Sequence, residues 1–80
     1  MNLHELALLL DRSGIRPDAY SLEGGVPDDR YCIEKRGSLW YVYYAERGQR
    51  NVERLVITED DACQYLLEVL QRDPSTKRQP

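Results

Sequence analysis

One stretch decides the fold of this chain: Leu39-Trp40-Tyr41-Val42-Tyr43-Tyr44-Ala45, followed by Glu46-Arg47-Gly48. Its first seven residues are almost all aromatic or β-branched, the types that suit the pleated, packed surface of a strand. Successive side chains of a strand point to opposite faces, so Trp40, Val42 and Tyr44 share one face. Neither face is polar. The stretch therefore predicts a central strand that is covered at least partly on both sides.

Strands are predicted on both sides of this stretch. Arg30 to Lys35 alternates as a strand, and Gly37-Ser38 suits a two-residue type II′ loop because Gly takes the positive φ at its first position. This loop pairs Lys35 with Trp40 and Ile33 with Val42. The sheet would then have one core face and one amphipathic face. After a turn at Gly48, Val52 to Ile57 predicts a third strand, and Ala19 to Leu22 is a candidate short extra strand.

An amphipathic helix is predicted before the strands, over residues 3–13. Asn2 is a suitable N-cap, and Glu5 stands at the third position, where a capping box needs an acid. Gly14 supplies the stop. The buried stripe is expected to consist of Leu3, Leu6, Ala7 and Leu10, widened by Leu8 and Leu9.

A second helix is predicted after the strands, capped by Thr58 and ended by Asp73-Pro74. The acids of its first turn complement the positive end of the helix dipole. The predicted fold class is therefore α+β: an N-terminal helix, a three- to four-stranded antiparallel meander and a C-terminal helix, in a two-layer sandwich. Residues 1–73 are expected to form a single domain, and residues 74–80 a disordered tail.

Length and composition limit the class of protein. Eighty residues are one domain, and 41% hydrophobic with 31% charged residues is the composition of a globular chain. Two cysteines are too few for a disulfide framework, and the apolar runs are too short to span a membrane. The run Leu6–Leu10 has neither a basic region before it nor a cleavage site after it, so we expect a cytoplasmic protein.

Charge is distributed unevenly around the net value of −3. Residues 30–54 carry six bases and three acids, whereas residues 1–29 carry six acids and two bases. The sheet segment is therefore basic and its flanks are acidic. Such a division steers a charged partner, or it reflects strand edges that carry Lys and Arg to prevent aggregation.

The titratable residues do not form a pattern typical of an active site. His4 lies in the first turn of the first helix, with no second metal ligand at a suitable spacing. Cys63 lies on the apolar stripe of the second helix, and we interpret both cysteines as buried thiols. Glu59, Asp60 and Asp61 are explained as acids at a helix start. We therefore expect no catalytic residue, no metal, no cofactor and no enzymatic activity.

The aromatic strand and the arginines near it have a binding interpretation. If both helices lie on one face of the sheet, Tyr41 and Tyr43 are left exposed on the other. Tyr and Arg are enriched at the centres of protein interfaces. Stacking of nucleic-acid bases on the tyrosines and packing within the chain are the alternatives. The predicted partner-binding residues are Leu39, Tyr41, Tyr43, Arg47, Arg50 and Arg54.

Three segments form a longer pattern: Tyr20-Ser21-Leu22-x-Gly24-Gly25-x-Pro27-x-x-Arg30-Tyr31-x-Ile33-Glu34, then Trp40-x-Val42-Tyr43-Tyr44-x-Glu46-Arg47-Gly48, then Glu59-x-x-Ala62-Cys63-x-Tyr65-Leu66-Leu67. Over about residues 15–70 this pattern resembles a family of small bacterial single-domain proteins of uncharacterised function. The resemblance implies an association with toxin and immunity genes, and hence a binder that blocks a toxin. The helix followed by bent strands is also similar to the Sm-like arrangement, an RNA-binding ring fold, from which the second helix and the acidic charge depart.

These observations predict a non-enzymatic protein-interaction module, either a homodimer or an immunity-type binder, that acts through the aromatic sheet face. The alternative is an Sm-like or other small nucleic-acid-binding protein that uses the basic, tyrosine-rich sheet. A membrane partner is not expected.

Overall fold

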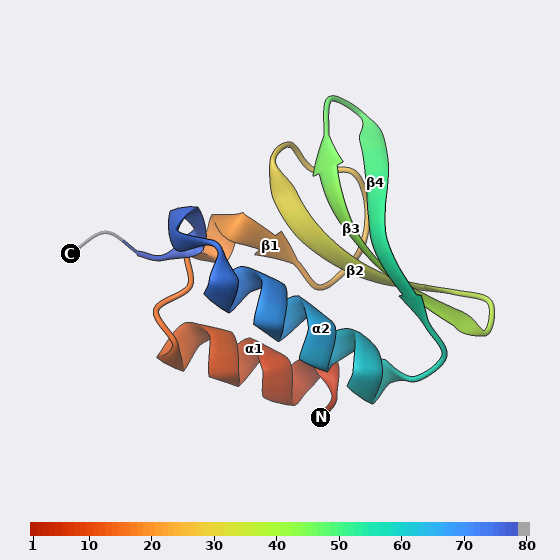
Figure 1. Ribbon diagram of the computed structural model, residues 1–80, viewed down its shortest axis with the longest axis horizontal. Coiled ribbons are helices and arrows are strands. Elements are labelled where there is room, and N and C mark those ends of the chain that lie inside the picture. The colour runs from red at the N-terminus through yellow and green to blue at the C-terminus, as the bar shows by residue number, and fades with distance from the viewer. Residues whose placement is uncertain (79–80) are drawn as a thin grey trace.

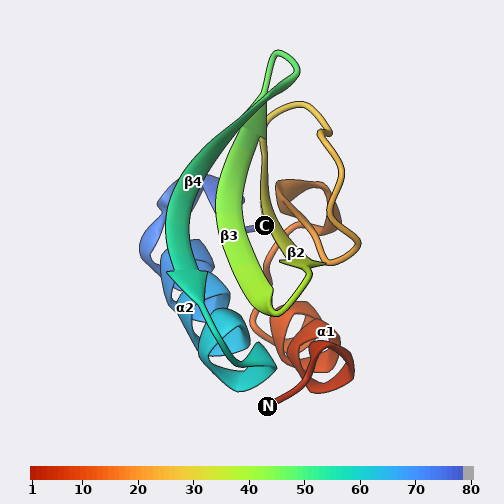
Figure 2. The same ribbon diagram turned by 90° about the vertical axis from the view of Figure 1, so that its right-hand side faces the viewer.

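The computed structural model describes residues 1–78 and has two layers, a four-stranded sheet and a pair of helices beneath it (Figures 1 and 2). The predicted α+β class and the order helix, sheet, helix are confirmed. In chain order the elements are α1 (Leu3–Arg12), the 3₁₀ turn η1 (Pro17–Ala19), β1 (Tyr20–Ser21), β2 (Arg30–Arg36), β3 (Leu39–Glu46), β4 (Gln49–Val56), α2 (Glu59–Arg72) and the 3₁₀ turn η2 (Pro74–Thr76).

The sheet has the strand order β1-β2-β3-β4. The hairpin register predicted from Gly37-Ser38 is confirmed, with Lys35 opposite Trp40 and Ile33 opposite Val42. Gly37 has a φ of +65°, which a type II′ turn requires at its first position. The expectation of an entirely antiparallel sheet is corrected at one edge. There β1 runs parallel to β2, because the loop 22–29 carries the chain back before β2 begins.

The main core lies between the sheet and the helices. Ile33 and Val42 supply its sheet side, and both are completely buried. Trp40 and Tyr44 lie on this predicted core face but are only partly buried. Leu8 and Leu9 were expected to widen the buried stripe of α1, yet they are 50% and 37% exposed, because α1 packs mainly along α2. The buried helical residues are Leu6, Leu10, Ala62, Cys63, Leu66 and Leu70.

Both helices begin at the caps that the sequence predicts. The Asn2 side chain accepts a hydrogen bond from the Glu5 backbone N–H, and Glu5 returns one to the Asn2 backbone. Thr58 Oγ1 accepts a hydrogen bond from the Asp61 N–H at the start of α2. These bonds satisfy amide groups that a helix start leaves unpaired.

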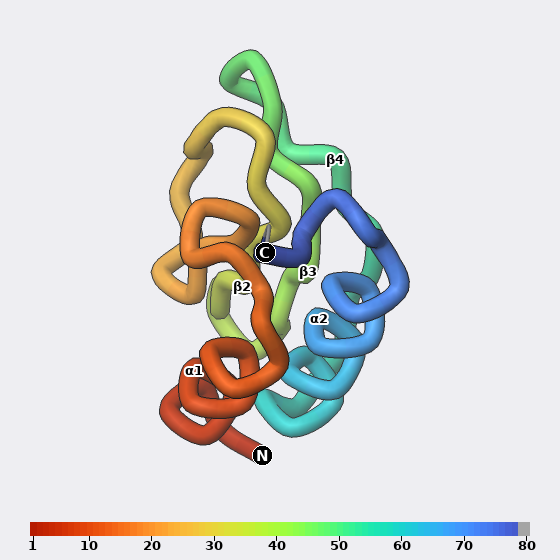
Figure 3. The backbone as a smooth tube through the Cα atoms, turned by 90° about the vertical axis from the view of Figure 1, so that its left-hand side faces the viewer, coloured from red at the N-terminus to blue at the C-terminus, as the bar shows by residue number. Residues whose placement is uncertain are grey.

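The expected disordered tail over residues 74–80 is wrong for its described part. Thr76 is 2% exposed, and its hydroxyl donates to the Leu70 carbonyl oxygen, 2.5 Å away. Lys77 forms a β-bridge with Ile15, so the C-terminal segment lies against the link between α1 and β1 (Figure 3). Residues 79–80, which complete the predicted tail, lie outside the described residues. The domain therefore extends at least to residue 78.

Candidate functional site

The outer face of the sheet, which points away from the helices, is partly covered by the chain's own loop 22–29. Tyr43 is completely buried there, in a small cluster with Cys32 and Ala45. Its hydroxyl donates to the Gly25 carbonyl oxygen at 2.7 Å. The prediction that Tyr43 is exposed for a partner is therefore wrong. The Tyr43 ring supports the loop, and burial raises the pKa of the Tyr43 hydroxyl.

Glu34 holds the loop 22–29 in place from strand β2. Its Oε1 accepts a hydrogen bond from the Gly25 N–H at 3.2 Å and lies 3.7 Å from Arg50 Nη2. Gly24 is buried with a φ of +73°, and a Cβ atom there would stand 2.3 Å from Glu34 Oε1. A residue with a Cβ atom would be strained at this φ and would have to displace the Glu34 side chain, so glycine suits this close approach.

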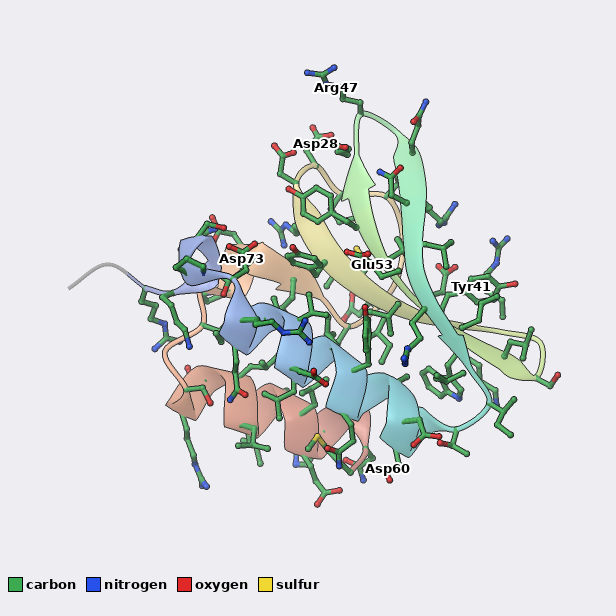
Figure 4. The ribbon with its side chains drawn as sticks, in the orientation of Figure 1. Asp28, Tyr41, Arg47, Glu53, Asp60 and Asp73 are labelled. Carbon is green, nitrogen blue, oxygen red and sulfur yellow. The ribbon has the colours of Figure 1, made fainter. Side chains whose placement is uncertain are left out.

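The predicted partner-binding residues do not gather into one surface. Arg36 lies over the ring of Tyr41 and Arg50 over the ring of Tyr43, both on the outer face. Arg54 lies on the helix side, 4.8 Å from the centre of the Tyr65 ring. Arg47 stands at the tip of the β3–β4 hairpin, far from α2, whereas Tyr41 projects beside β4 (Figure 4). Leu39 is half-buried next to the β2–β3 turn.

Strand β4 is the outermost strand on its side of the sheet, and it is the main exposed feature (Figure 2). Every residue from Gln49 to Leu55 is exposed. Val52 lies opposite Tyr43 and Leu55 opposite Tyr41, so both point to the outer face, where they are 51% and 52% exposed. Ile57, just after the strand, is 74% exposed. We call the free edge of β4 with Val52, Leu55 and Ile57 the β4 surface.

The β4 surface contains a β-bulge. Val42 lies opposite Arg54 and Tyr43 opposite Val52, so Glu53 is an extra residue on β4. Glu53 and Arg54 consequently both lie on the helix side of the sheet, Glu53 at the wall of a groove and Arg54 on Tyr65. Three of the six predicted binding residues lie on β3, two lie on β4 and one lies at the turn between them. The prediction did not include the exposed Val52, Leu55 and Ile57. The signal was present, because the last strand of a meander leaves one edge unpaired.

A groove of about 300 Å³ opens between the sheet and the end of α2. Two of its polar side chains, Tyr31 and Asp73, bond to each other. Tyr31 Oη donates to Asp73 Oδ2 at 3.2 Å, and burial together with this bond raises the pKa of Tyr31 to about 12. Asp73 Oδ1 accepts hydrogen bonds from the Ser75 hydroxyl and from the Ser75 backbone N–H, and these bonds hold η2 and lower the pKa of Asp73. The hydrogen bond between Tyr31 and Asp73 thus links the sheet to the end of α2. Its lining consists of Tyr31, Glu53, Tyr65, Val69, Arg72 and Asp73.

The described residues present no reactive thiol. Cys32 and Cys63 are both free and buried, as predicted, and burial raises the pKa of each. Burial and the nearby Glu59 carboxylate together raise the pKa of Cys63 to about 11. Nucleophilic and metal-binding cysteines act as thiolates, and these two stay protonated near neutral pH. Within residues 1–78, His, Cys, Asp and Glu side chains form no group of three that would hold a metal ion.

Comparison of the chain with models of protein families, with curated proteins and with solved structures found no match. In the part of the chain that the structure describes, no helix combines the length and the apolar character needed to cross a membrane.

Proposed function

We propose that this chain is a non-enzymatic protein-interaction module that binds its partner through the β4 surface. The observation that carries the proposal is the free edge of β4, eight residues long from Gln49 to Val56. Val52 and Leu55 are exposed along it, and Ile57 is exposed just after it. A free strand edge offers unpaired backbone N–H and C=O groups to another strand. The flanking apolar side chains would add the area that such pairing alone lacks.

Two further observations support a binding role over catalysis. The buried thiols have raised pKa values, and the Asp73 carboxylate beside the groove already accepts hydrogen bonds from Tyr31 and Ser75. The β4 surface, in contrast, leaves apolar area in water that contact with another protein would cover.

Nucleic-acid binding receives less support from the geometry. Single-strand binders present aromatic rings beside a continuous basic groove. Here Tyr43 is buried and Arg50 lies close to Glu34, while Arg54 faces the opposite side of the sheet.

Affinity capture with matched surface variants tests this function. Val52→Lys/Leu55→Lys places two charges on the β4 surface. Leu8→Lys/Leu9→Lys does the same at exposed apolar residues of α1, and so controls for added charge and lost hydrophobicity. Circular dichroism and thermal unfolding establish that both variants fold.

We expect the unmodified chain and the α1 variant to retain the same protein partner, and the β4 variant to lose it. That partner is identified by mass spectrometry and can be the chain itself. Equal retention by all three proteins contradicts the proposal, and so does the absence of any retained protein.

A further inference from the structure

We infer that the partner of the β4 surface is a second copy of this chain. The two β4 strands would pair antiparallel about a two-fold axis that passes between Glu53 and Arg54. This inference rests on the proposed function, because it names the partner of the same surface. It joins two four-stranded sheets into one of eight strands and removes the exposed edge from both copies.

The side-chain directions along β4 are symmetric about this axis. In a two-fold strand pair, each residue and the residue opposite it must point to the same face of the sheet. In a regular strand, residues three apart point to opposite faces. Because of the bulge at Glu53, Val52 and Leu55 both point to the outer face. Glu53 and Arg54, between them, both point to the helix side.

Counted outward from the midpoint between Glu53 and Arg54, the side chains of β4 therefore point to the same faces in the same order in both directions. Asn51 and Val56 follow on the helix side, opposite Tyr44 and Trp40 of β3. The bulge thus makes the strand symmetric about this point. A strand without it would be symmetric only about a residue.

The charges of the two β4 strands are complementary. In this register Glu53 of each copy lies opposite Arg54 of the other, which gives two ion pairs related by the axis. The ring of Tyr65 already holds the Arg54 guanidinium on the helix side, the side on which Glu53 also lies. Opposite charges at directly facing positions stabilise strand pairing, and like charges there oppose it.

The pairing also covers apolar side chains of both copies. Val52 of each copy lies opposite Leu55 of the other, so two pairs of half-exposed side chains cover one another on the outer face. These pairs flank the ion pairs along the edge, although they lie on the opposite face.

Bulges and inward-pointing charges also protect strand edges from indiscriminate pairing. Here Glu53 and Arg54 favour one register of the strand pair and oppose the two registers that are shifted by one residue. A shift by one residue in one direction puts Glu53 opposite Glu53 of the second copy. The opposite shift puts Arg54 opposite Arg54. The charges therefore select a single partner strand and a single alignment.

Exchange of the two charges tests the inference. Sedimentation equilibrium is measured for the unmodified chain, for Glu53→Arg, for Arg54→Glu and for an equimolar mixture of these two variants. Glu53→Arg places Arg opposite Arg, and Arg54→Glu places Glu opposite Glu, so each variant alone should dimerise at least about tenfold more weakly. In the mixture every facing pair has opposite charges again, and the heterodimer should form.

Matched controls are Glu46→Arg and Arg47→Glu, which make the same charge changes at the tip of the β3–β4 hairpin, away from the proposed axis. We expect these two to dimerise like the unmodified chain. Weakening of the single variants without recovery in the mixture overturns the register. An unmodified chain that stays monomeric at about 1 mM overturns self-association altogether. In that case, capture of a different protein that depends on Val52 and Leu55 would still support the proposed function.

Discussion

The buried ring of Tyr43 leads to a measurable prediction about stability. The side chain is fully buried under the loop 22–29, and its hydroxyl bonds to Gly25. We expect Tyr43→Ala to lower the free energy of unfolding by about 3 to 5 kcal/mol, the usual cost of removing a buried aromatic ring. That is a large part of the stability of a small domain, which is roughly 5 kcal/mol or a little more.

Two further variants separate the contributions to this loss. Tyr43→Phe keeps the ring and removes only the hydrogen bond to Gly25, so we expect a loss of about 1 kcal/mol, or roughly 4 to 8 °C in Tm. Tyr41→Ala is the matched control on the same strand and face. Because the Tyr41 ring is already partly exposed, we expect a loss below about 2 kcal/mol.

Urea unfolding, followed by tyrosine and tryptophan fluorescence at one fixed protein concentration, measures these differences. The reasoning fails if Tyr43→Ala costs no more than Tyr41→Ala. Such a result would mean that the loop does not hold the ring, and that the face around Tyr43 is open after all.

Three other predictions address the loop, the thiols and the end of α2. Gly24→Ala should lower the free energy of unfolding by about 1 to 2 kcal/mol, because alanine is strained at this positive φ and its Cβ would displace Glu34. The control is Gly48→Ala, because Gly48 has a similar φ of +75° but open space around it. Both variants are measured by urea unfolding. Both cysteines should react slowly with a thiol reagent at pH 8 and rapidly in denaturant, since burial raises their pKa values. If the folded protein reacted as fast as a free thiol, that result would contradict their burial. The lowered pKa of Asp73 means that its ionised form is favoured in the folded state, so its stabilising contribution is present above about pH 4 and is lost as the pH falls through its folded pKa. Urea unfolding of the unmodified chain and of Asp73→Asn between pH 2 and pH 6 should show a difference at the upper end that disappears at the lower end, and a constant difference would exclude this linkage.

Much of the fold follows from local features of the sequence. Asn2 and Thr58 can be recognised as helix caps from the sequence. Each side-chain oxygen bonds a backbone N–H only a few residues ahead, so the contact needs no distant part of the chain. The register of β2 with β3 follows from the two-residue loop at Gly37, since its length fixes the pairing. The direction of each β3 side chain follows from simple alternation.

The errors occur where distant segments decide the structure. The sequence does not show that residues 22–29 fold over the outer face of the sheet, because nothing local indicates that Gly25 bonds to Tyr43 and Glu34. The same contacts bury the ring that was expected to bind a partner. Thr76 appeared to belong to a polar tail, yet its environment is supplied by α2 and by the segment around Ile15.

The sequence predicts binding residues on β3, at the β3–β4 turn and on β4, but it does not identify the exposed side chains of Val52, Leu55 and Ile57. Alternation alone cannot reveal the bulge at Glu53, which depends on how β4 is aligned with β3. Without the bulge, Val52 and Leu55 would point to opposite faces and would not form one surface. The free edge of β4, in contrast, follows from the order of the strands.

The bridge between Ile15 and Lys77 also bears on how the protein is made. At about 5 to 20 residues per second, the ribosome takes roughly 3 to 12 s to add residue 77 after residue 15. During that interval Ile15, which is completely buried in the finished domain, does not yet have Lys77 to pair with. The last contact can therefore form only when translation of the domain is nearly complete, and a nascent chain that stalls before residue 77 would be a target for chaperones and proteases.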